Sequence, residues 1–227
     1  MILYQQIKEN QYDSVLKLRK ISISATVFYS LFPPNLCYNK HIEFTKIKGS
    51  VSNTEGKKMI IRNENEKDYK KIYQLIKKAF ETAEHKDGNE QDLAEALRKG
   101  SSFVEELSLV AEIDGDIAGH IMYSKAKIGE KTVLVLAPLS VAPQYQRQGV
   151  GTKLITESMQ RAKEIGWEYI FVLGSENYYP RFGFIPAEKY GAETPDGIPA
   201  QNFMAVKLRK DAPMLNGKLV YAKEFGI

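Results

Sequence analysis

The chain has 227 residues, of which 43% are apolar and 26% are charged, so it can bury a substantial core. The formal net charge is +4, but residues 1–58 hold nine Lys/Arg against four Asp/Glu, while the rest holds 23 against 24. This near-neutral main part argues against a nucleic-acid partner, which would need a basic face. The single cysteine, Cys37, excludes an internal disulfide and argues against a cysteine-based zinc site, so no metal is expected.

Residues 1–58 are predicted to form an N-terminal extension or linker, because they show no sustained hydrophobic period and end in a polar, glycine-containing stretch. Two interpretations stay open: a native segment, disordered or docking a partner, or a segment upstream of a true translation start at Met59. The apolar stretch 21–32 is too short to span a bilayer and resembles a poor signal sequence. We therefore expect no membrane partner and a cytoplasmic protein.

Residues 59–227 are predicted to form one domain. In chain order, the patterns indicate a strand at 59–62, helices at 66–80 and 89–99, strands at 108–113 and 117–124, a strand at 133–141, a helix at 151–165, and strands at 169–173, 203–208 and 218–225. Asp114-Gly115-Asp116 is a hairpin signal between two of these strands. The apolar strand, helix and strand from 133 to 173 indicate a buried parallel pair.

The most informative segment runs from Leu139 to Thr152, from a strand through a glycine-containing turn into a helix. The first N–H groups of a helix have no internal partners and carry partial positive charge, so such a turn can bind an anion. Gly149 and Gly151 have no Cβ to hold the anion away. A pyrophosphate fits this description, although two glycines can also merely shape a turn.

The spacing matches neither the dinucleotide fingerprint nor the nucleotide-binding P-loop. Gln146-Arg147-Gln148-Gly149-Val150-Gly151 instead resembles the pyrophosphate-binding motif of the GNAT superfamily of N-acetyltransferases, and Tyr179-Pro180-Arg181-Phe182-Gly183-Phe184 resembles a second motif of that superfamily. The resemblance covers residues 59–227. It implies an α/β fold with a mixed, mostly antiparallel sheet, a central splayed parallel strand pair and flanking helices, and it implies acetyl-CoA as co-substrate.

The resemblance also implies which residues hold the coenzyme. Backbone groups of Leu139 and Val141 would bind the pantetheine arm, and Pro138, which cannot donate to a ladder, independently favours splayed strands there. Gln146 and Arg147 would flank the pyrophosphate, although Arg147 could equally be a solvated surface charge. The amides that would cradle it belong to Gln148, Gly149, Val150, Gly151 and Thr152.

Tyr179 matches the general acid of the superfamily, which protonates the departing thiolate. A tyrosine near pKa 10 facing a thiol near 8.5 makes this transfer uphill by roughly 2 kcal/mol, which is small enough for a coupled step. Two alternatives stay open: the neighbouring Tyr178 could take this role, or Tyr179 could only pack against the Gly183-Phe184 turn.

The general base is unassigned, because the strand at 133–141 holds no acidic residue; Glu112 and His120 are weak candidates. At pH 7, deprotonating a lysine-like amine costs about 4.6 kcal/mol and an α-amino group only about 1 kcal/mol. We therefore expect the acceptor to be a small molecule or a low-pKa amine rather than a histone-like lysine. The long segment 183–202 lies where it could influence acceptor choice or simply bridge two strands.

Two further points stay open. A coenzyme-binding sensor or interaction module without catalysis is the alternative to an enzyme, and a homodimer is one assembly compatible with the resemblance.

Overall fold

The computed structural model describes residues 58–81 and 88–226. The predictions for residues 1–57 therefore lie outside the described part of the chain. The strands are β1 (Met59–Asn63), β2 (Leu109–Ile113), β3 (Asp116–Ile128), β4 (Lys131–Val141), β5 (Tyr169–Leu173), β6 (Ile185–Pro186), β7 (Ala192–Glu193), β8 (Phe203–Lys207) and β9 (Gly217–Val220). The helices are α2 (Tyr69–Glu81), α3 (Glu90–Lys99) and α4 (Val150–Glu164), with short 3-10 turns between several elements.

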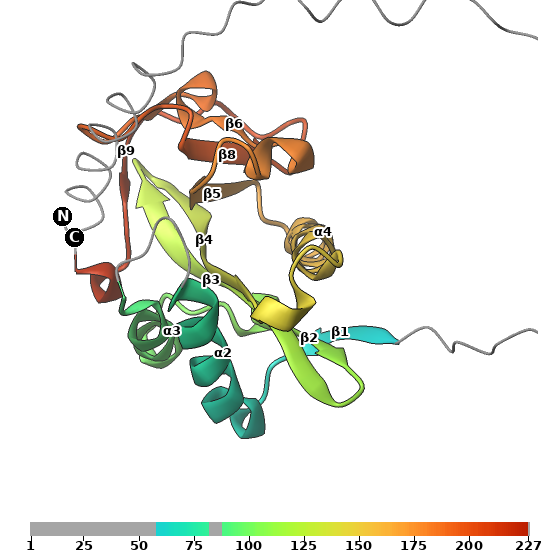
Figure 1. Ribbon diagram of the computed structural model, residues 1–227. Coiled ribbons are helices and arrows are strands. Elements are labelled where there is room, and N and C mark those ends of the chain that lie inside the picture. The colour runs from blue at the N-terminus through green and yellow to red at the C-terminus, as the bar shows by residue number, and fades with distance from the viewer. Residues whose placement is uncertain (1–57, 82–87, 227) are drawn as a thin grey trace, which may run out of the picture. The chain divides into compact units, whose positions relative to one another are not determined.

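The main sheet has the strand order β1-β2-β3-β4-β5-β8-β6 (Figure 1). Its neighbours pair antiparallel except β4 and β5 at its centre, which are parallel. The C-terminal β9 pairs with β3, and the two-residue β7 lies parallel to β9. The predicted mixed, mostly antiparallel sheet with a central parallel pair is confirmed.

The parallel pair separates along its length. Only Leu134 with Ile170 and Val135 with Phe171 are in register between β4 and β5. Beyond them β5 continues beside β8, while β4 continues beside β3 past a shift in register near Pro138. The position of Pro138 faces β3, where its missing N–H coincides with the shift in register, whereas the pairing of β4 with β5 already ends at Val135, before the proline where the sequence predicted the break.

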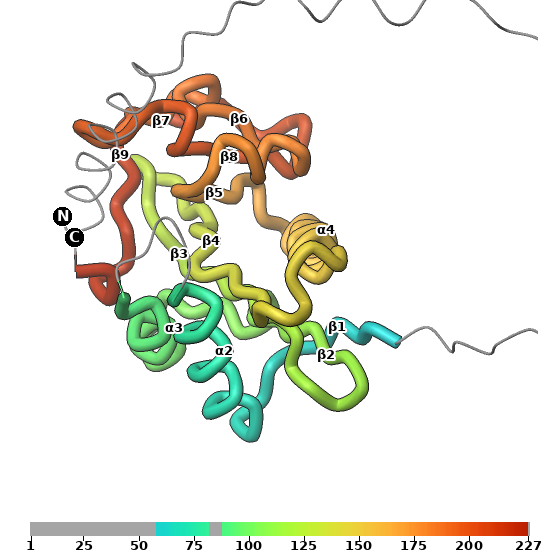
Figure 2. The backbone as a smooth tube through the Cα atoms, viewed as in Figure 1, coloured from blue at the N-terminus to red at the C-terminus, as the bar shows by residue number. Residues whose placement is uncertain are grey.

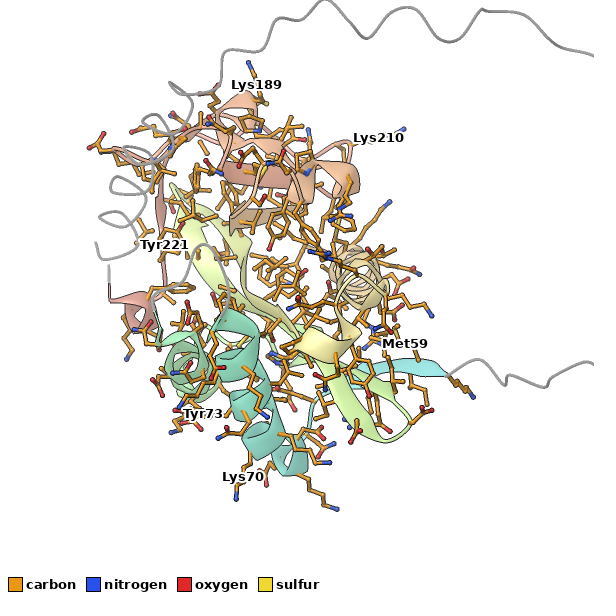
Figure 3. All side chains as sticks on the ribbon, in the orientation of Figure 1. Met59, Lys70, Tyr73, Lys189, Lys210 and Tyr221 are labelled. Atoms are coloured by element: carbon orange, nitrogen blue, oxygen red, sulfur yellow. The ribbon has the colours of Figure 1, made fainter. Side chains whose placement is uncertain are left out.

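Helices cover both faces of the sheet, with α4 on one face and α2 and α3 on the other (Figure 1). One buried cluster joins α4 to the sheet through Leu154, Ile155 and their neighbours. A second joins the sheet to α2 and α3 through Ile72, Ile76 and Leu97. These positions recur at helical spacing, which is why the sequence indicated amphipathic helices here. The side chain of Lys70, on the opposite face of α2, points away from the sheet (Figure 3).

The tube in Figure 2 shows the β2–β3 hairpin beside β1. Its two-residue loop has positive φ at Asp114 and Gly115, 54° and 84°, as a type I′ turn requires. That turn prediction is confirmed, but β3 runs to Ile128 and is longer than predicted.

Two predictions near the C-terminus need correction. The predicted strand at 218–225 ends at Val220, and a 3-10 turn spans Lys223–Phe225. The segment 183–202, predicted as one long connection, contains β6, β7 and the 3-10 turn Ala187–Tyr190. These pieces are two to four residues long, too short for a hydrophobic period to reveal, and the buried Ala187 and Ala192 tie them to the core.

Candidate active site

The turn before α4 presents free amides to solvent. Gly149 is the N-cap of α4, and no side chain of residues 58–81 or 88–226 caps this helix. The first intrahelical bond is donated by the N–H of Lys153 to the carbonyl of Gly149. Residues 146–149 are exposed, and the first turn of α4 contains no acidic residue. An uncapped, exposed helix N-terminus without a competing carboxylate can accept an anion.

The two glycines of the turn, Gly149 and Gly151, lie in different surroundings. Gly149 has φ of 84°, and a Cβ on it would meet nothing within 4 Å, so the space beside it is open. A Cβ on Gly151 would lie 2.5 Å from the hydroxyl oxygen of Tyr178. The sequence argument that both glycines make room for an anion therefore fits Gly149, whereas Gly151 makes room for a tyrosine.

The side chains of the turn stabilise its shape. Gln146 donates from Nε2 to the carbonyl of Val141 at 3.2 Å, and Gln148 donates from Nε2 to the carbonyl of Gln144 at 2.7 Å. Arg147 has φ of 59°, an uncommon value outside glycine, and its side chain is exposed. Of the three side chains, only Arg147 makes no hydrogen bond within the described part of the chain.

The amides of Leu139 and Val141 face the gap between β4 and β5. Ala142 donates its N–H to Ala118 of β3 at 2.9 Å, so its backbone faces β3. Backbone direction alternates along a strand, which turns Leu139 and Val141 away from β3. Both residues lie beyond Val135, the last residue paired with β5, so an extended ligand could pair with β4 there.

Tyr179 lies at the carboxyl end of β5, within the 3-10 turn Tyr179–Phe182. Its ring packs edge-on against Phe184 at 5.6 Å between centroids and against Tyr178 at 5.2 Å. A Cβ on Gly174 would meet this ring, so Gly174, which the sequence did not single out, makes room for it. Burial raises the pKa of Tyr179, so its hydroxyl stays protonated at neutral pH. That hydroxyl has no hydrogen-bond partner among the described residues.

The structure separates the two candidate tyrosines. Tyr178 points its hydroxyl at the first turn of α4, beside Gly151, while Arg181 lies over its ring at 4.1 Å. Tyr179 instead lies over Gly174, where β5 ends. Tyr179 is thus beside the end of β5 and Tyr178 beside the start of α4. The contact of Tyr179 with Phe184 fits the packing alternative.

The two weak base candidates differ in surroundings. Glu112 forms a salt bridge with Arg62 at 2.9 Å on β1 and is partly exposed, as a structural surface residue would be. His120 is fully buried on β3, and its Nε2 lies 3.0 Å from Oε2 of Glu64 and 3.3 Å from Oγ of Ser108. Sequence reasoning missed Glu64, because it lies in a polar stretch with Glu66 and Asp68 and belongs to no motif.

Glu64 sits in a buried ion pair. Arg98 of α3 donates to both of its carboxylate oxygens, from Nε at 2.8 Å and from Nη2 at 2.9 Å. Burial alone would raise the pKa of Glu64, but its hydrogen bonds with His120 and Arg98 outweigh this and hold the pKa at about 2. Burial lowers the pKa of His120, so the imidazole is neutral near pH 7 and donates Nε2–H to the carboxylate.

These shifts predict how stability changes with acid. Because the pKa of Glu64 is lower in the folded protein than its ordinary value of 4.5, the unfolded chain takes up this proton first as the pH falls. The contribution of Glu64 is complete above pH 4.5 and is lost between about 4.5 and 2, a loss of about 3 kcal/mol. Denaturant titrations from pH 7 to pH 2 measure it. Glu64→Gln should show a shallower decline over this window, and parallel curves would contradict the assignment.

Within residues 58–81 and 88–226, no helix is long and apolar enough to cross a bilayer. No group of three or more potential metal ligands gathers in the same residues.

Comparisons with known proteins agree with this geometry. The family model described as "Acetyltransferase (GNAT) family" matches residues 69–184, just over half of the chain. The uncharacterized N-acetyltransferase YjhQ of Escherichia coli is 37% identical over 118 residues, which span 50% of this chain and 65% of YjhQ. The uncharacterized N-acetyltransferase YhbS of the same species is 33% identical over 129 residues, which span 56% of this chain and 73% of YhbS.

Solved structures of two GNAT proteins are similar to this chain in fold. The crystal structure of YhbS from Escherichia coli in complex with CoA superposes with a TM-score of 0.69 at 26% identity and covers 77% of this chain and 96% of YhbS. A GNAT family acetyltransferase from Brucella melitensis in complex with acetyl-CoA superposes with a TM-score of 0.62 at 32% identity and covers 75% of this chain and 99% of that one.

Proposed function

The chain belongs to the acetyltransferase (GNAT) family, whose members are acetyl-CoA-dependent acyltransferases, and on this premise we propose that it acetylates the amine of a small molecule or another low-pKa amine. The predicted resemblance to GNAT N-acetyltransferases is thereby confirmed at the level of the family. The proposed catalytic domain comprises residues 59–227. A cytoplasmic location and a homodimer stay predictions.

One observation carries the proposal: the free amides at the N-terminus of α4 and the outward amides of Leu139 and Val141 border the same gap beside β4. A pyrophosphate fits the first group and an extended pantetheine arm fits the second. The exposed Arg147 stands at the turn between them and can screen the phosphate charge. Acetyl-CoA bound there would supply the activated acetyl group.

In this proposal Tyr179 is the general acid. Its hydroxyl gives its proton to the sulfur as the bond between sulfur and the acetyl carbon breaks and the bond from the amine nitrogen to that carbon forms. The tyrosinate then recovers a proton from that nitrogen, so the tyrosine ends the cycle neutral. An ammonium substrate carries one further proton, which it must lose to another acceptor before its nitrogen can attack.

The acceptor preference depends on how easily the ammonium form of the substrate loses a proton before its nitrogen attacks. The strand β4 carries no acidic side chain that could remove it directly. Amines with a pKa near 7.8 need only about 1 kcal/mol to lose it at pH 7, against about 4.6 kcal/mol for a lysine-like amine. A site with no carboxylate on β4 therefore favours amines that are already partly neutral, and acetylation of a protonated amine there needs a base on another strand.

A panel of amines tests the function. Purified protein is mixed with acetyl-CoA and each amine, and release of free thiol is followed at pH 7. We expect release with small, low-pKa amines; acetylation confined to high-pKa amines would contradict the preference. Saturable coenzyme binding without thiol release from any amine would leave the alternative of a catalytically inactive coenzyme-binding sensor.

Thr152→Glu is expected to weaken coenzyme A binding on the order of 10- to 100-fold without destabilising the fold. Thr152 is exposed in the first turn of α4, where a carboxylate is favourable to the helix dipole but repels a bound phosphate. Titration calorimetry measures the affinity and thermal unfolding measures the stability. Thr152→Gln is the neutral control of the same length, and equal affinities for the two variants would contradict a phosphate at this turn.

A further inference from the structure

Among the buried polar atoms that lack a partner within the described residues are Nδ1 of His120 on β3 and Oγ of Ser140 on β4. His120 is fully buried and Ser140 is 2% exposed. Buried polar groups almost always have a protein or water partner, so each such atom needs an explanation. The mechanism described so far uses neither of them.

The two residues lie on neighbouring strands. His120 of β3 and Ser140 of β4 are directly opposed in the antiparallel ladder, so their side chains share a face and their Cβ atoms are about 5 Å apart. On its other side His120 opposes Val110, which packs under α2 and α3, so this is the face opposite α4. A water molecule bonded to both atoms would satisfy them, since each bond needs only about 2.8 Å.

The hydrogen bonds of His120 fix which nitrogen is free. Nε2 lies between the carboxylate of Glu64 and the hydroxyl of Ser108, and a neutral imidazole that donates from Nε2 keeps a lone pair on Nδ1. Glu64 in turn is held by Arg98. A carboxylate behind the imidazole fixes its tautomer and stabilises the imidazolium that forms when Nδ1 takes a proton.

Ser140 connects this pair to the reaction site. It lies on β4 between Leu139 and Val141, whose amides face the gap. β4 itself offers no carboxylate, and the unpartnered nitrogen nearest to Ser140 in the ladder belongs to the histidine opposite it on β3. This step rests on the proposed function, because it requires the amine to be acetylated beside β4.

We propose that Nδ1 of His120 and the hydroxyl of Ser140 bind a water molecule that removes the first proton from the acceptor amine. The ammonium gives one proton to this water, the water gives one to Nδ1, and the neutral amine keeps the electron pair with which it attacks the acetyl carbon. The imidazolium later releases its proton to solvent. His120 is the base acting through water, and Glu64 is a positioning residue.

Three single variants test the proposal. His120→Gln keeps an amide nitrogen to donate to Glu64 but removes the Nδ1 acceptor. Ser140→Ala removes the hydroxyl that has no partner, so it should not destabilise the protein. Ser124→Ala is the matched control, because its buried hydroxyl also lacks a partner in the described part but lies on β3 opposite Val135, away from Ser140.

Two acceptors are compared at pH 7 with acetyl-CoA: an alkylamine, which is protonated, and an aromatic amine, which is not. His120→Gln should lower kcat/KM for the alkylamine about 100-fold and Ser140→Ala about 10-fold, with little change for the aromatic amine. Coenzyme A affinity should not change. Ser124→Ala should match the wild type with both acceptors.

The pH dependence of the acetylation rate distinguishes a base from a residue with a purely structural role, because only the loss of a base changes this dependence. The groups around the imidazole are Glu64, Arg98, Asp68 and the hydroxyl of Ser108, and burial keeps its pKa below the ordinary value. The wild-type rate should therefore fall on acidification as His120 takes up a proton, and this step should vanish in His120→Gln.

The results that would overturn the proposed role of His120 and Ser140 are as follows. Wild-type rates with the alkylamine in both variants overturn the proposal, as do equal losses with both acceptors. If His120→Gln does not fold, Ser140→Ala compared with Ser124→Ala decides it alone. If the wild type binds coenzyme A but acetylates neither amine, the proposed function fails and this inference fails with it, an outcome that the wild type reveals without any variant.

Discussion

Tyr179→Phe is expected to lower turnover by about 100- to 10,000-fold while coenzyme A affinity stays nearly unchanged. The ring of Tyr179 packs against Phe184 and over Gly174, and a phenylalanine ring keeps both contacts. Only the hydroxyl is lost, and it has no hydrogen-bond partner within the described residues, so the fold does not depend on it. Thiol release measures turnover, and calorimetry measures affinity.

Tyr178→Phe is the matched control for Tyr179→Phe. The hydroxyl of Tyr178 lies beside Gly151 at the start of α4, so its loss should change coenzyme affinity more than turnover. If Tyr178→Phe abolished turnover and Tyr179→Phe did not, the two tyrosines would exchange roles. If neither variant lost turnover, the departing sulfur would take its proton from another donor, and Tyr179 would be a packing residue.

Glu64→Ala is expected to destabilise the protein by about 3 to 5 kcal/mol, because it leaves the buried Arg98 without its partner. For a domain of this size, such a loss lowers the melting temperature by roughly 10 °C. It also removes the hydrogen bond that orients His120. Thermal unfolding and denaturant titration at pH 7 measure the effect.

Glu112→Ala is the control for Glu64→Ala. Glu112 also pairs with an arginine, but its side chain is 28% exposed and Arg62 keeps a second partner in Asp68. A partly exposed pair contributes about 0 to 1 kcal/mol, so this variant should stay close to the wild type. A loss for Glu64→Ala as small as that for Glu112→Ala would contradict a strong buried pair between Glu64 and Arg98.

The two arginine–carboxylate pairs also show what a sequence conceals. In the sequence neither Glu64 nor Glu112 belongs to a recognisable motif, yet Glu64 is buried and Glu112 is near the surface. Burial depends on which helix covers which face of the sheet. Arg98 reaches Glu64 only because α3 packs there, 34 residues away along the chain.

The sequence by itself determined the elements whose signals are local: the amphipathic helices, the hairpin at Asp114-Gly115, the apolar β5 and the turn bearing Gly149. A hydrophobic period or a turn residue acts over a few neighbours, so it can be recognised without knowing the fold. The shift in register between β3 and β4 near Pro138 also follows from a local fact, the missing N–H of proline, whereas the end of the β4–β5 pairing at Val135 does not.

The tertiary structure alone decided where distant side chains meet. It placed Tyr178 over Gly151, Tyr179 over Gly174, and Ser140 beside His120, whose partner Glu64 lies 56 residues away. Such contacts depend on strand order and register, which no local pattern in the chain specifies.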